Sequence, residues 1–164
     1  METNAVWERR MAALWSAFDD YDGEEFLERV EGLTAELPHG DAVALFETAS
    51  ANDSIGRPRE AVTLYRQALS AGLKAGRRRR AVIQLASSLR NLGQPEESVA
   101  LLRAERAAES DELDDAVIAF LALALVDTGH AKEAAALALT ALSGHLPRYN
   151  RSLANYAKEL DESV

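Results

Sequence analysis

Cysteine is absent from this 164-residue sequence, and proline occurs only four times. Without cysteine the chain has no disulfide, no cysteine-ligated zinc and no thiol nucleophile, and we expect it to work in the reducing cytoplasm. The scarcity of proline, together with much Ala, Leu, Glu and Arg, favours helices, because these side chains lose little rotamer freedom in a helix. The sequence also lacks a run of alternating β-branched residues. The composition therefore predicts an all-α protein.

Long apolar runs and an excess of positive charge are also lacking. The longest apolar run, Ala116–Val126, is shorter than the roughly 20 residues that a membrane-spanning helix needs, and we expect it to form a buried helix. Charged residues at Glu2, Glu8, Arg9 and Arg10 interrupt the apolar residues of the N-terminus, which is unlike a signal peptide. The net charge of −9 opposes nucleic-acid binding by the surface as a whole. We therefore expect neither a membrane nor a nucleic acid as the partner.

No catalytic, cofactor-binding or metal-binding constellation is visible in the sequence. The histidines His39, His130 and His145 are far apart, and no pair has the i, i+4 spacing of a helical metal motif. The stretch SAGLKAG lacks the residue order of a phosphate-binding loop, and no G-x-S-x-G elbow is present. We therefore predict a protein that is not an enzyme and that needs no cofactor and no metal.

A turn that recurs along the chain is the strongest positive signal. The stretches SIGRPREA, NLGQPEES and DTGHAKEA each contain a glycine that can end one helix in a left-handed conformation, just before residues that can begin another. A glutamate follows each turn, and it suits the positive end of a helix dipole. A fourth glutamate, Glu25, lies near the start of the chain, and the residues directly after the four glutamates recur at intervals of 35, 37 and 36. They are Phe26, Ala61, Ser98 and Ala134.

The period of the apolar residues predicts four helix pairs, at about residues 3–36, 41–71, 77–108 and 113–143. A further helix at about 150–160 has Leu153, Tyr156, Ala157 and Leu160 along one side. This apolar side indicates a helix that caps the end of the array. We expect residues 1–164 to form a single domain, because the length is that of one ordinary domain.

These features resemble the tetratricopeptide repeat family, whose unit is a helix-turn-helix of about 34 residues. In the second pair, Ala61, Tyr65 and Ala68 match the small-aromatic-small pattern of the family's second helix. The first pair departs from the pattern, with Tyr21 at the place of the turn glycine and Leu14 at the place of a small residue. The first-helix pattern of the family falls on Leu85, Ala86 and Leu89 in the third pair and on Leu121, Ala122 and Leu125 in the fourth.

The stretches IQLASSLRNLGQPEESVALL and IAFLALALVDTGHAKEAAALAL resemble, more narrowly, small stand-alone bacterial tetratricopeptide proteins that have no assigned activity. The resemblance implies a right-handed α–α superhelix. It also implies a non-enzymatic scaffold that binds a protein or peptide segment in a concave groove, without indicating which one.

The family lines this groove with the first helix of each pair, and the turn glycines set the register. Four arginines, Arg77–Arg80, open the first helix of the third pair against its dipole, so we expect something to compensate them. Arg80 or Arg90 can bind a carboxylate through two hydrogen bonds. The candidate partner-binding residues are Met11, Trp15, Phe18, Phe46, Ser50, Arg77, Arg80, Gln84, Ser87, Arg90, Asn91, Phe120 and Leu123.

Other interpretations of these residues stay open. The arginines can instead neutralise the acidic stretch Asp19–Glu31 or neighbouring helices of the same array, and Met11, Trp15 and Phe18 can be core residues. A homo-oligomer that buries Ala119, Phe120 and Leu123 is an alternative to a peptide-binding scaffold. Nucleic-acid binding through Arg77–Arg80 is a third possibility, which the lack of interleaved aromatic residues disfavours.

Overall fold

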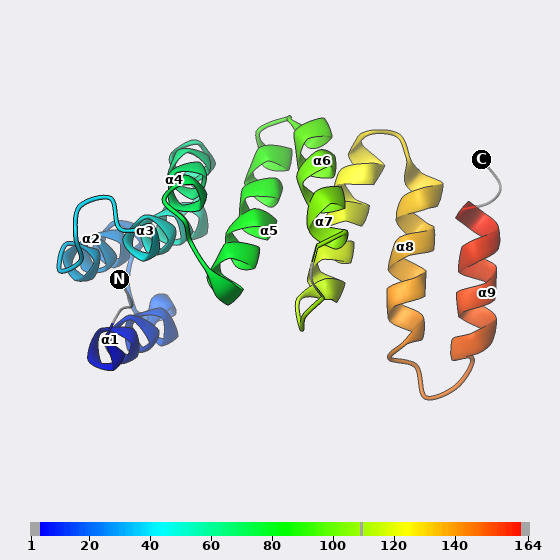
Figure 1. Cartoon of the computed structure of the whole chain (residues 1–164), viewed down its shortest axis with the longest axis horizontal. Coiled ribbons are helices and arrows are strands. Elements are labelled where there is room, and N and C mark those ends of the chain that lie inside the picture. The colour runs from blue at the N-terminus through cyan, green and yellow to red at the C-terminus, as the bar shows by residue number, and fades with distance from the viewer. Residues whose placement is uncertain (1–3, 109, 162–164) are drawn as a thin grey trace. The chain divides into compact units, whose positions relative to one another are not determined.

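The computed structural model describes residues 4–108 and 110–161, without the side chains of Ala75 and Asp161. Within these residues it contains helices and no strand, as the composition predicted (Figure 1). The predicted first helical residue, Thr3, lies outside the described residues. The helices are α1 Ala5–Ser16, η1 Phe18–Asp20, α2 Gly23–Thr34, α3 Ala42–Ser54, α4 Pro58–Ser70, α5 Ala75–Asn91, α6 Pro95–Arg106, α7 Asp114–Asp127, α8 Ala131–Ser143 and α9 Asn150–Asp161.

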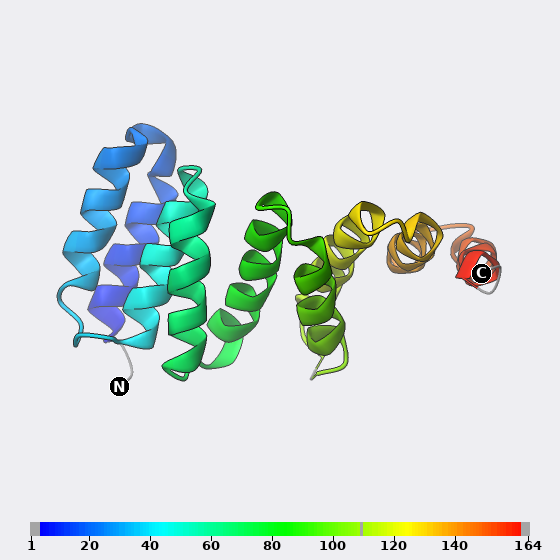
Figure 2. The same cartoon turned by 90° about the horizontal axis from the view of Figure 1, so that it is seen from above.

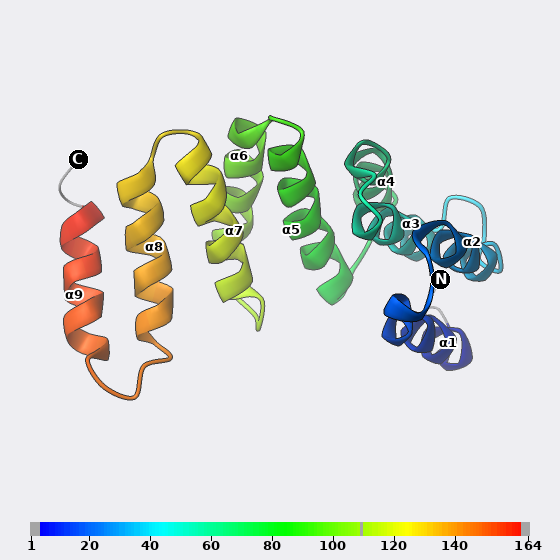
Figure 3. The same ribbon diagram turned by 180° about the vertical axis from the view of Figure 1, so that it is seen from behind.

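The chain divides into two compact units, Met1–Ser88 and Leu89–Val164. The boundary falls inside α5, so most of that helix belongs to the first unit. In the first unit α2 packs against α1 and α3, and α3 packs against α4 (Figure 2). In the second unit α7 packs against α6 and α8, and α8 packs against α9 (Figure 3). The predicted helix pairs are confirmed, whereas a single domain over residues 1–164 stays a prediction.

The recurring turn has the predicted glycine conformation. Gly56, Gly93 and Gly129 have φ values of 81°, 78° and 83°. In each turn the amide after the glycine donates to a carbonyl five residues earlier, which satisfies a group that the helix end leaves open. The three bonds are Arg57 N to Asn52 O at 2.8 Å, Gln94 N to Leu89 O at 2.9 Å and His130 N to Leu125 O at 2.8 Å.

The two helices of the first pair are connected differently, and Tyr21 stands where the other pairs have the turn glycine. Without a turn glycine, the chain passes from α1 into the short 3-10 helix η1 and then becomes extended at Tyr21. Asp22 then caps α2, because its carboxylate accepts a hydrogen bond of 2.8 Å from the amide of Glu25. Helix α1 itself ends at Ser16.

The residue after each recurring glutamate is buried in every pair, so the register of the repeats is confirmed. Phe26 lies in the core of the first unit, where Trp7, Met11 and Val30 pack around it. The Trp7 indole N–H donates to the carbonyl of Leu33 at 2.8 Å, which satisfies a buried polar group. The equivalent residues Ala61, Ser98 and Ala134 are buried too.

One expectation about burial is wrong. We expected Ala116–Val126 to be buried, but Leu123 and Val126 are 46% and 53% exposed, because the packing of α7 against α6 and α8 leaves one side uncovered. In α9, Ala157 is fully buried while its neighbour Tyr156 is 64% exposed, so only part of the expected apolar side is covered. Among the described helices, none has both the length and the apolar content to cross a bilayer.

Candidate partner-binding site

A pocket of about 280 Å³ opens in the first unit between α1, α3 and the first turns of α5. Most of its α1 wall is apolar, and its other walls carry charge. The α1 residues lie on one side of that helix at the i, i+3, i+4 and i+7 spacing. The pocket is lined by Glu8, Met11, Ala12, Trp15, Glu47, Arg77 and Arg80.

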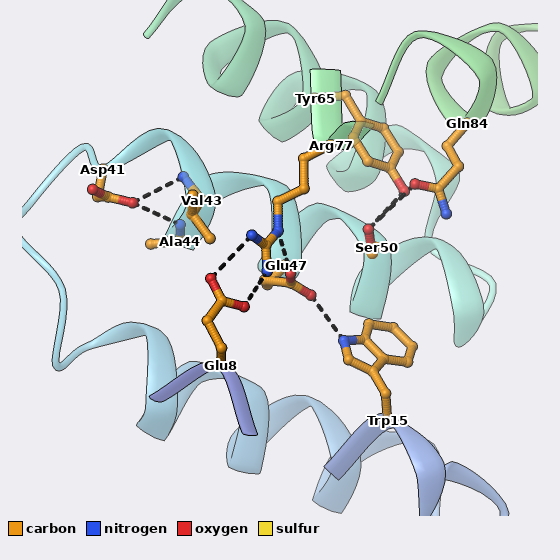
Figure 4. A network of polar contacts seen from close by, with 10 residues as sticks. All are labelled: Glu8, Trp15, Asp41, Val43, Ala44, Glu47, Ser50, Tyr65, Arg77 and Gln84. Carbon is orange, nitrogen blue, oxygen red and sulfur yellow. Dashed lines mark hydrogen bonds and ion pairs between the residues drawn. The ribbon is translucent and has the colours of Figure 1, made fainter. Parts of the chain in front are cut away.

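Arg77 ties the three helices of this pocket together (Figure 4). Its guanidinium donates two hydrogen bonds to the Glu8 carboxylate, at 2.6 and 3.1 Å, and a third to Glu47 at 3.0 Å. The other carboxylate oxygen of Glu47 accepts a hydrogen bond of 2.8 Å from the Trp15 indole N–H. Burial opposes the charge on Arg77, but the hydrogen bond to Glu8 and the charge of Glu47 outweigh it and raise the pKa of Arg77. The charge of Arg77 is therefore neutralised by two carboxylates of the same chain.

Arg80, one turn further along α5, is placed differently. It is exposed, and its guanidinium lies over the ring of Phe46, 5.2 Å from the ring centre. In the described part of the chain no carboxylate pairs with it. A guanidinium held on an aromatic face keeps its N–H donors directed outward at its edge. Arg80 therefore leaves a charged donor available at the mouth of the pocket.

A second polar layer lies beside the pocket. Tyr65 donates to Ser50 at 3.4 Å, and Ser50 donates to Gln84 at 3.4 Å, both long bonds. Burial raises the pKa of the Tyr65 hydroxyl. Burial also raises the pKa of Asp53, and the hydrogen bond of 2.7 Å that Asp53 accepts from Ser88 offsets this only in part. These groups support the pocket by holding α3, α4 and α5 together.

The structure brings Met11, Trp15, Arg77 and Arg80, four of the predicted partner-binding residues, together at this pocket. Phe46 and Ser50 are buried, so they lie beneath the surface that a partner can touch. Phe18 packs edge-on against Phe26, with ring centres 4.7 Å apart, in an aromatic cluster with Trp15. Gln84 and Ser87 are half-buried farther along α5.

The remaining predicted residues belong to the second unit. Arg90 pairs with Asp127 of α7, with 2.6 Å between Nε and the carboxylate oxygen. Arg90 is therefore engaged within the fold, as Arg77 is, and both pair with neighbouring helices rather than with the acidic stretch Asp19–Glu31. Asn91 is exposed at the end of α5, and Phe120 is half-buried beside the exposed Leu123.

Sequence reasoning missed that Glu8 and Glu47 hold Arg77. Opposite charges on the first helices of three successive pairs were the available signal. A second hollow, of about 830 Å³, was not predicted. It lies between α2, α3 and α4, where Leu37, Leu45 and Leu64 supply much of its apolar lining.

Among the described residues, the lining of the pocket mixes charged and apolar side chains. No group of three or more His, Asp or Glu side chains among them is placed to hold a metal ion. The pocket combines the cation of Arg80 with the indole of Trp15, and such a mixture suits the recognition of a side chain or chain segment.

Antiparallel helix pairs joined by a repeated glycine turn define a helical-repeat protein. The family model for the tetratrico peptide repeat matches residues 42–160, and the chain belongs to this family. No curated protein matches the chain. Among solved structures, the MamA RS-1 ArsTM double mutant is similar, with a TM-score of 0.65 and 16% sequence identity. The match covers 99% of this chain and 98% of that one, and at this identity it establishes the fold alone.

Proposed function

We propose that the chain is a non-enzymatic interaction scaffold that binds an acidic segment of a protein or peptide at the pocket of its first unit. The observation that carries the proposal is the contrast between Arg77 and Arg80. Glu8 and Glu47 neutralise Arg77, whereas Arg80 has only the ring of Phe46 beneath it. A carboxylate from a partner is the group that this free guanidinium binds best.

The α1 wall of the pocket, beside Arg80, indicates a second property of the partner. Trp15, which is half-buried, lines the pocket from α1, and an indole favours contact with an apolar or aromatic side chain. We therefore propose a segment in which an acidic residue lies close to an apolar one. The network behind Arg77 holds α1, α3 and α5 in place before binding, which lowers the ordering cost of the complex.

The test compares two arginine substitutions in a quantitative capture from the native organism, followed by peptides from the captured protein. Arg80→Glu is expected to weaken binding about ten-fold or more, because it places a like charge against the partner's carboxylate. Arg59→Glu is the matched control, since Arg59 is an exposed arginine on α4 that does not line the pocket. Equal binding by the wild type and Arg80→Glu would remove the pocket from the proposal.

A homo-oligomer is the second candidate, and the exposure of Leu123 and Val126 on α7 favours it. In this case a second copy would cover the apolar side of α7. Light scattering of the wild type and of Leu123→Glu separates the two candidates, because only an oligomer formed through α7 is expected to dissociate. We also propose a cytoplasmic location, which rests on the absence of cysteine.

A further inference from the structure

The hollow of about 830 Å³ lies wholly within the first unit and shares no lining residue with the pocket that contains Arg80. Helices α2 and α4, which supply two of its walls, both pack against α3, which supplies another (Figure 2). Leu37, Leu45 and Leu64 line the hollow and are half-buried, so each keeps some apolar surface open to solvent. Sites for small molecules combine such a volume and lining with a few polar groups.

The carboxylate of Glu31 gives this hollow a negative charge. Glu31 is exposed on α2, and among the described residues no cation pairs with it. Within the same part of the chain the lining contains no lysine and no arginine, so His39 is its only other residue that can carry a charge. The charge of the lining therefore favours a cation as the ligand.

The two helix ends at the hollow favour a cation as well. Helix α2 ends at Thr34, which lines the hollow, and it has no basic residue in its last turn to compensate the negative end of its dipole. Helix α3 begins beside the hollow, but its positive end is already compensated. There the Asp41 carboxylate accepts hydrogen bonds of 2.8 and 3.1 Å from the amides of Val43 and Ala44.

The two hydroxyl groups of the lining offer acceptors to a ligand. Thr34 donates its hydroxyl proton to the carbonyl of Glu31 at 3.2 Å. In the contact of 3.4 Å between the hydroxyls of Thr34 and Thr48, the donor is then Thr48. The half-buried Thr48 is left with oxygen lone pairs, which accept a hydrogen bond from an ammonium group but give none to a carboxylate.

We propose that the hollow binds a small organic cation, a primary ammonium group attached to an apolar body. The ammonium group pairs with Glu31 and donates to Thr48, while the apolar body lies against the three leucines. An ammonium group has three donors and no acceptor, which matches these groups. This site is separate from the pocket for an acidic segment, so it goes beyond the proposed function, and the failure of either proposal leaves the other standing.

The probes are octylammonium, octanoate and octanol, which have the same chain length and differ in charge. Each is titrated at about pH 8 into the 164-residue chain, and heteronuclear NMR spectra give both the dissociation constant and the amides that shift. Octylammonium is expected to bind about five-fold more tightly than octanol, the upper range for an exposed ion pair, and octanoate more weakly than octanol. The largest shifts are expected in residues 31–48.

Glu31→Gln is expected to remove the preference for octylammonium and to leave the binding of octanol unchanged. Glu28→Gln is the matched control, because Glu28 is an exposed glutamate of the same helix that does not line the hollow. Ala35→Trp fills the hollow from an exposed position of its lining and is expected to weaken the binding of all three probes.

Circular dichroism of each variant checks that the fold is retained. A wild type that does not bind octylammonium, or that shows its shifts outside the hollow, would overturn the proposal. Octanoate that binds as tightly as octylammonium would overturn it too, and so would an equal loss of affinity in Glu28→Gln and Glu31→Gln.

Discussion

Arg77 on α5 holds Glu8 on α1 through two hydrogen bonds, although 69 residues separate them in the sequence. The same guanidinium also binds Glu47 on α3. An arginine at the start of a helix opposes the helix dipole, and here two carboxylates from neighbouring helices compensate it. The first helix of the chain is thereby fastened to the third and the fifth, which form the pocket.

Replacing Arg77 with methionine is expected to destabilise the first unit. Glu47 is only 5% exposed at its side chain, so the substitution leaves a nearly buried carboxylate without its cation. We expect a loss of about 2–3 kcal/mol, less than for a fully buried pair because Arg77 itself is partly exposed. Urea unfolding measures the change. Arg10→Met is the control, and because the pair that Arg10 forms with Glu36 is exposed, an equal loss there would contradict the prediction.

The ionisation of Asp53 is expected to make stability depend on pH. Burial raises its pKa in the folded state above the ordinary value of about 3.9, so the folded protein binds this proton more tightly than the unfolded chain does. Its contribution to stability is therefore full below the unfolded pKa and is lost as the pH rises through the folded pKa.

Asp53→Asn provides the measurement, because the amide oxygen can still accept the hydrogen bond from Ser88 but does not titrate. The free energies of unfolding of the wild type and the variant are compared from acidic to neutral pH. As the pH rises, the free energy of unfolding of the variant is expected to increase relative to that of the wild type. Two curves that stay parallel throughout would show that Asp53 is not the source of the dependence.

Two glycine-to-alanine substitutions are expected to act in opposite directions. Gly93 has a φ of +78°, where alanine is strained, so Gly93→Ala is expected to cost about 1 kcal/mol. Gly32 lies in α2, and a Cβ added there meets nothing within 4 Å. Gly32→Ala is expected to stabilise the protein by about 0.5–1 kcal/mol. Thermal unfolding compares them, and stabilisation by both would refute the role of the left-handed turn.

A quencher is expected to reach the indole of Trp15 more easily than that of Trp7. Trp15 lines the pocket, whereas Trp7 is buried and donates to a backbone carbonyl. Acrylamide is therefore expected to quench the wild type more strongly than Trp15→Phe, in which Trp7 alone emits. Phenylalanine also removes the donor to Glu47, so unfolding in urea provides the control for an altered fold. Equal quenching of the two proteins would mean that the indole of Trp15 is shielded.

The helices, their turns and the buried register could be predicted from the sequence, because each depends on nearby residues. Gly56, Gly93 and Gly129 show where helices end, since a left-handed backbone conformation is a property of one residue and its neighbours. The period of apolar residues shows which side of a helix is buried. The same register placed Met11, Trp15 and Arg80 on the side that faces the pocket.

The tertiary structure alone decided which charges and apolar side chains are left without a neighbour. In sequence, Arg77, Arg80 and Arg90 are alike, and only the packing of distant helices gives carboxylates to the first and the last. Likewise, Leu121 and Tyr156 hold the same place in the repeat, but α7 has helices on both flanks and α9 packs against α8. Local periodicity determines which side of a helix is apolar, whereas its exposure depends on how many neighbours the fold supplies.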